Sequence, residues 1–80
     1  MKQRFGIPET EVGKWMLENM TRLDLSCVDV ANKLHITRQV VAYHVNGHHK
    51  PNYPFIMAYC HIFGDIDDPE EIWKLTIEEG

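Results

Sequence analysis

Eighty residues suffice for one small domain, and 44% of them are hydrophobic, an ordinary fraction for a chain that buries a core. The formal net charge of −4 excludes a uniformly basic nucleic-acid-binding protein but allows a locally basic surface. No apolar run has the length of a signal peptide or a membrane-spanning helix, so we expect one domain over residues 1–80 that works in the cytoplasm.

The first helix is predicted from about Pro8 to Arg22. Proline suits a first helical position, and Glu9 and Glu11 would lie at the positive end of the helix dipole. The apolar residues recur at helical spacing and predict one buried face, made of Val12, Trp15, Met16 and Met20.

A second, short helix is predicted to begin after Ser26, because Ser26 and Asp29 have the spacing of a capping box. Its expected buried face carries Cys27, Val30, Ala31 and Leu34. Thr37 predicts the N-cap of a third helix and Gly47 its end. The inward positions of that third helix are Val41, His44 and Val45.

A fourth helix is predicted from about Pro54 to Phe63, with Gly64 ending it. Its expected apolar face carries Ile56, Tyr59, Cys60 and Phe63. Asp68-Pro69 predicts the start of a fifth helix, which would bury Ile72, Trp73 and either Leu75 or Ile77. No alternating strand pattern competes, so the sequence predicts an all-α bundle of about five helices.

The cysteines and histidines do not predict a catalytic, metal or cofactor site. Cys27 and Cys60 lie far apart on apolar faces, which is typical of buried, reduced thiols. His44 and His48 are four positions apart, but Gly47 separates them and no carboxylate lies nearby to complete a ligand set. We therefore expect no enzyme activity, no metal and no cofactor.

Two short helices joined by a tight turn, VANKLHITRQVVAYHVNG at positions 30–47, have the outline of a helix-turn-helix. The resemblance described next depends on the relative spacing of a set of residues in and beyond this segment. They are Leu34, Ile36-Thr37-Arg38, Val41, Asn46-Gly47, Pro51, Ile56, Cys60 and Phe63-Gly64. On these residues the chain, from about Val12 to Trp73, resembles the lambda repressor/Cro-like helix-turn-helix domains. The resemblance implies a five-helix bundle whose third helix enters the major groove of DNA.

The chain differs from that family at three positions. His35 stands where a turn glycine is usual, and histidine can adopt a positive φ at some cost. Cys27 stands where the family often has a glutamine that binds a phosphate of the DNA, so we expect that contact to be missing. His44 occupies an inward position that is normally aliphatic or aromatic.

The third helix carries the residues that we expect to read base edges. Arg38 can donate two hydrogen bonds to guanine, Gln39 can pair similarly with adenine, and Ala42 can contact the thymine methyl group. Tyr43 and Asn46 lie at the edge, within reach of a base or a phosphate. The expected phosphate contacts are Ser26, Thr37, His48, His49 and Lys50. The alternative is a polar face and loop that only contact water.

Charge is unevenly distributed along the chain. No Asp or Glu lies at positions 35–61, whereas seven acids follow Ile62 against one basic residue, Lys74. The acidic segment either solvates a terminal helix or serves a function.

These observations predict a sequence-specific regulator of the phage Cro-like repressor type, which binds a double-stranded DNA operator as a homodimer. The alternative is the same fold used as a protein-interaction module, antirepressor or antitoxin-like, that binds another regulatory protein. The negative net charge favours this module, and Arg38-Gln39 followed by small Ala42 favours DNA.

Overall fold

The computed structural model describes residues 8–78, which form helices and connecting turns without any strand. The helices are α1 (Glu11–Arg22), α2 (Cys27–Leu34), α3 (Arg38–Asn46), α4 (Tyr53–Ile62) and α5 (Pro69–Glu78). The all-α prediction with five helices is confirmed. None of the helices within residues 8–78 is long and apolar enough to cross a membrane.

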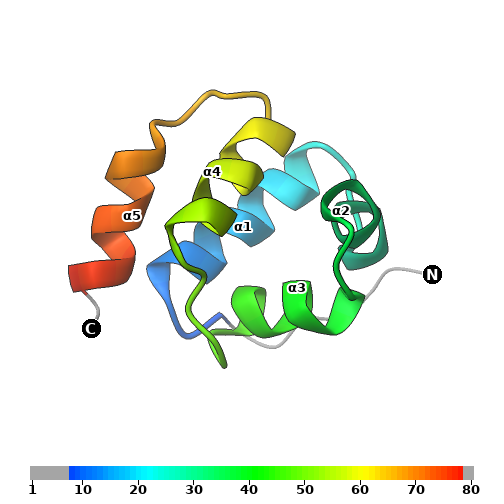
Figure 1. Cartoon of the computed structure of the whole chain (residues 1–80), viewed down its shortest axis with the longest axis horizontal. Coiled ribbons are helices and arrows are strands. Elements are labelled where there is room, and N and C mark those ends of the chain that lie inside the picture. Colours follow the sequence, from blue (N-terminus) through cyan, green and yellow to red (C-terminus); the bar gives the residue numbers. More distant parts are fainter. Residues whose placement is uncertain (1–7, 79–80) are drawn as a thin grey trace.

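α1 and α4 lie in the middle of the view in Figure 1, with α3 below them. α1 packs against α3 and α5, while α2 packs against α3 and α4, and α4 also packs against α5. In the same view, α5 lies on the left and α2 on the right. This arrangement gives a radius of gyration of 11.3 Å.

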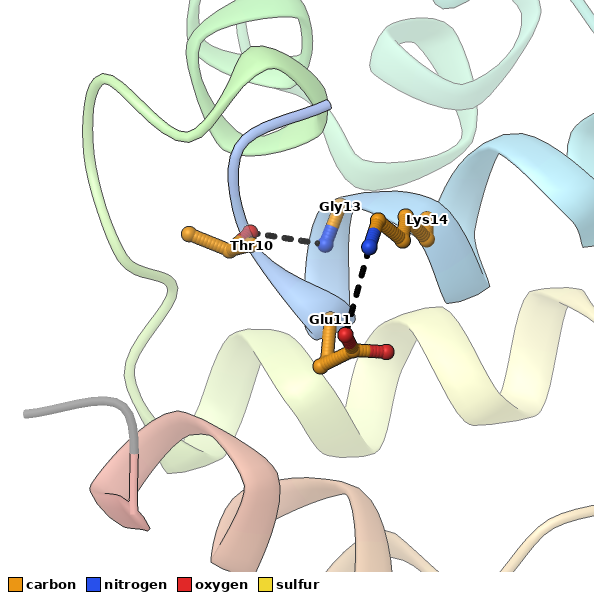
Figure 2. Close-up of polar contacts among 4 residues, drawn as sticks. All are labelled: Thr10, Glu11, Gly13 and Lys14. Carbon is orange, nitrogen blue, oxygen red and sulfur yellow. Dashed lines mark hydrogen bonds and ion pairs between the residues drawn. The ribbon is translucent and has the colours of Figure 1, made fainter. Parts of the chain in front are cut away.

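α1 begins at Glu11, so the predicted start at Pro8 is wrong by three residues. The reason is Thr10, an extended residue whose Oγ1 accepts a hydrogen bond of 2.9 Å from the backbone N–H of Gly13 (Figure 2). This N-cap satisfies one of the backbone donors at the helix start, and it sets the first helical residue at Glu11. Glu9 consequently precedes the helix, whereas Glu11 lies in its first turn and accepts a hydrogen bond from Lys14 Nζ at 3.2 Å.

The predicted caps of α2 and α3 are confirmed. Ser26 and Asp29 form the complete capping box of α2, and Thr37 caps α3, which Gly47 ends at a φ of 84°. α4 begins one residue before the predicted Pro54, because Asn52 is its N-cap and accepts a hydrogen bond of 3.1 Å from Phe55 N.

α4 ends at Ile62, with Phe63 as its C-cap. α5 begins at Pro69 as predicted, and Asp68 Oδ1 accepts a hydrogen bond of 3.1 Å from Glu70 N in the first turn. Its buried residues include Thr76, which the sequence did not indicate. Of the two alternatives at the end of the helix, Leu75 packs partly on the core, and Ile77 is 57% exposed.

The core contains residues from all five helices and is nearly the set that helical periodicity predicts. Its buried hydrophobic residues are Val12, Met16, Met20, Cys27, Val30, Ala31, Val41, Val45, Ile56, Tyr59, Cys60, Phe63 and Ile72. Trp15, Leu34 and Trp73 pack against this core while remaining partly exposed. Burial raises the pKa of both cysteine thiols to about 11, so they are protonated at neutral pH.

Candidate nucleic-acid interface

The position of α3 is fixed by a close crossing with α1. A Cβ atom added to Gly13 would lie 2.2 Å from the carbonyl oxygen of Val45, so only glycine allows the two backbones to approach this closely. On its other side α3 packs against α2, and Val41 and Val45 are fully buried. The orientation of α3 is therefore set by packing on two neighbouring helices.

A turn of three residues separates α2 from α3. His35 occupies the turn position where a glycine is usual, and it adopts the left-handed conformation with φ 57° and ψ 41°. Its backbone N–H donates to the carbonyl of Ala31, and Ile36 N donates to the same oxygen at 3.0 Å. Thr37 Oγ1 then accepts a hydrogen bond of 3.3 Å from Val40 N and starts α3.

The first turn of α3 presents the two residues expected to read bases. Arg38 and Gln39 are both exposed, whereas Ala42 and Tyr43, one turn later, are half-buried. Gln39 Nε2 donates a hydrogen bond to Tyr43 Oη, which joins these two side chains. The sequence predicted that Gln39 and Tyr43 lie on this face, but it did not predict the hydrogen bond between them.

Asn46 is less available than predicted. Asn46 is half-buried, and its side-chain Oδ1 is buried without a hydrogen-bond partner among residues 8–78. The carboxamide oxygen therefore faces the protein interior, and a contact with DNA would have to use the amide nitrogen.

The loop after α3 folds back on the last turn of that helix. The backbone N–H groups of His48 and His49 both donate to the carbonyl of Tyr43, at 2.9 and 3.3 Å. Their rings also contact the Tyr43 ring, with centroid distances of 5.8 and 5.1 Å. His48, His49 and Lys50 are exposed, so the loop adds them to the edge of the α3 surface.

Ser26 caps α2, and the phosphate contact expected of it stays a prediction. Its Oγ accepts a hydrogen bond from Asp29 N at 3.1 Å and donates one to Asp29 Oδ2 at 3.0 Å. The hydrogen bond from Ser26 N and that from its hydroxyl lower the pKa of Asp29, so this side chain is a carboxylate at neutral pH. Ser26 stabilises α2, and the adjacent negative charge disfavours a phosphate there.

His44 is buried, as its inward position predicts, and is 5% exposed. Its Nδ1 lies 2.6 Å from the hydroxyl oxygen of Tyr59, and its ring contacts that of Phe55 at a centroid distance of 5.1 Å. Burial lowers the pKa of His44 to about 4, with a further contribution from His49. The ring is therefore neutral at physiological pH.

A pocket of about 430 Å³ lies between α3 and the start of α4, and we call it the α3–α4 pocket. The residues of α3 that line it are Val40, Tyr43 and His44. The loop and α4 contribute His49, Lys50, Asn52 and Phe55. Sequence reasoning missed this pocket because the two groups of residues are brought together only by the fold. Among residues 8–78 no group of three or more His, Cys, Asp or Glu side chains could hold a metal ion.

Comparisons of the chain with protein-family models, with curated proteins and with solved structures found no match. The resemblance to the lambda repressor/Cro-like domains therefore depends on the residue spacing within this chain. It remains a prediction, as does the DNA-binding role that it implies.

Proposed function

We propose that this protein is a sequence-specific DNA-binding transcriptional regulator, similar to Cro-like repressors, in which α3 reads the major groove of an operator. The observation that carries the proposal is the exposure of Arg38 and Gln39 on the first turn of a helix that two neighbouring helices hold in place. A rigid support favours base readout, because hydrogen bonds to base edges need side chains held in a defined geometry.

The chemistry of this surface suits a duplex. Arg38 provides the paired donors that guanine accepts. Gln39 keeps its carbonyl oxygen and one amide hydrogen for adenine after donating the other hydrogen to Tyr43. Thr37 and the exposed loop residues 48–50 lie at either end of α3, where they would contact phosphates.

A homodimer would fit a palindromic operator, and α4 and α5 offer a surface for it. Met57 and Ile77 are 49% and 57% exposed, and these two helices pack together through the rings of Tyr53 and Trp73, whose centroids are 5.9 Å apart. In the proposed homodimer the partner subunit would cover these exposed apolar side chains. Such a regulator would act in the cytoplasm, where the operator is.

The test is selection of bound sequences from random duplexes, followed by fluorescence anisotropy with the selected and a random duplex. Arg38→Ala should weaken binding to the selected duplex by about 1–3 kcal/mol and relax the base preference at one position. Lys74→Ala is the matched control, since it removes one exposed positive charge from α5 and should leave the preference unchanged. Equal losses on both duplexes would make Arg38 a phosphate contact, and no preferred sequence would overturn the proposal.

The net charge of −4 favours a second candidate, an interaction module that binds a basic regulatory protein. Glu78 is exposed at the end of α5, and Glu79 lies outside the described residues. If DNA is the target, changing both to glutamine should raise affinity slightly, and more at low than at high ionic strength. If a basic partner is the target, the same change should weaken that complex, and DNA binding should stay weak at every salt concentration.

A further inference from the structure

The α3–α4 pocket has the size and the mixture of groups found in small-molecule sites. Its volume of about 430 Å³ falls within the range of roughly 300–1,000 Å³ that such sites occupy. Val40 supplies an aliphatic wall, and Tyr43 and Phe55 supply aromatic ones. Aromatic walls favour a planar, unsaturated ligand that can stack or pack edge-on.

His44 lines this pocket, and its ring can offer a hydrogen-bond donor there. Tyr59 is fully buried, and its hydroxyl has a hydrogen bond to His44 Nδ1. A buried hydroxyl hydrogen needs an acceptor, and Nδ1 accepts when the hydrogen of the neutral ring is on Nε2. In this tautomer the Nε2–H makes no hydrogen bond with other residues of the described part of the chain.

The other polar groups of the pocket are also donors. Asn52 Oδ1 is already engaged as the cap of α4, so the amide nitrogen is the part left for a ligand. Lys50 adds a positive charge, and His49 adds a second ring that can donate. None of the described residues that line the pocket is acidic. A set of donors with a positive charge and no acid complements an anion with several acceptor oxygens.

We propose that the α3–α4 pocket binds small aromatic carboxylates and that a bound molecule competes with DNA. The carboxylate would accept hydrogen bonds from Lys50 and Asn52, while the ring lies between the aromatic walls. Competition follows because Tyr43, His49 and Lys50 belong both to the pocket and to the surface assigned to DNA. The competition with DNA rests on the proposed function, whereas the binding of the carboxylate to the pocket does not.

The first experiment uses the full chain without DNA. 2-Naphthoate is titrated while backbone amide resonances are followed by NMR, and the neutral isostere 2-naphthamide is the control ligand. Saturable shifts centred on His49, Lys50 and Phe55, with the amide at least about tenfold weaker, are expected for charge-assisted binding. No saturation, or equal binding of the two ligands, would overturn the proposal.

Asn52→Asp tests the location of the site. Aspartate caps a helix as well as asparagine does, so α4 should remain folded, but a negative charge now faces the carboxylate. We expect the affinity for 2-naphthoate to fall about tenfold or more through like-charge repulsion. Asn32→Asp, an exposed position on α2 with the same change of charge, should keep the wild-type affinity. Equal affinities for wild type and Asn52→Asp would contradict this location.

The second experiment adds 2-naphthoate to the anisotropy titration with the selected duplex. At ten times the ligand dissociation constant, competition should raise the apparent Kd for DNA about elevenfold. An unchanged Kd with the pocket occupied would overturn the competition. If the wild-type chain binds no duplex at all, the proposed function fails. The titration with 2-naphthoate in the absence of DNA then still decides whether the pocket binds the carboxylate.

Discussion

Replacing Gly13 by alanine separates the contribution of local sequence from that of packing. In an isolated helix, glycine is less favourable than alanine by about 1 kcal/mol, so helix propensity alone predicts a more stable protein. In this structure Gly13 is in the first turn of α1, where that helix crosses α3. We expect the opposite sign, because the new methyl group meets the backbone of α3.

The size of the effect follows from the crossing distance. The added Cβ would lie 2.2 Å from Val45 O and 3.1 Å from the carbonyl carbon, and the obstacle is backbone, which cannot rotate away. The helices must therefore separate. Overpacking of this kind costs about 1–3 kcal/mol, and a backbone clash belongs at or above the upper end. After subtraction of the propensity gain, Gly13→Ala should destabilise the domain by about 2 kcal/mol.

Thermal and urea unfolding followed by circular dichroism measure this change. A loss of about 2 kcal/mol in a domain of this size should lower the Tm by roughly 8–16 °C. Thr21→Ala, an exposed position on the same helix, is the control and should leave the Tm unchanged or slightly higher. A Gly13→Ala protein at least as stable as wild type would refute the close crossing of α1 and α3.

Three further predictions concern stability. Because burial lowers the pKa of His44 from 6.5 to about 4, the unfolded chain binds a proton that the folded protein does not, so stability should fall by up to about 3 kcal/mol as the pH drops from 6.5 to 4. Urea unfolding at a series of pH values across that range measures this loss of stability. If the loss between pH 6.5 and 4 is the same in His44→Gln as in the wild type, another group causes it. Ser26→Ala removes the capping box with Asp29 and should cost about 1 kcal/mol, and an unchanged urea midpoint would contradict that role. Leu34→Ala removes a partly buried side chain from the core and should cost about 2 kcal/mol, so an unaltered Tm would argue against its packing.

Much of the fold could be predicted from the sequence, because its signals are local. The capping box of Ser26 and Asp29 and the Thr37 cap depend on residues three positions apart, and they fixed the starts of α2 and α3. Helical spacing of apolar residues identified almost the whole buried core for the same reason. The exposure of Arg38 and Gln39 follows directly from that spacing, since they lie opposite the buried face of α3.

The tertiary structure decided what depends on residues far apart in the chain. The tight crossing at Gly13 and Val45, and the enclosure of the Asn46 carbonyl oxygen, have no local signal. The α3–α4 pocket is likewise formed when the loop after α3 brings Asn52 and Phe55 beside that helix. Periodicity specifies which face of a helix is apolar, but the distance between two helices is set by the side chains that interlock between them, and that distance exists only in the packed molecule.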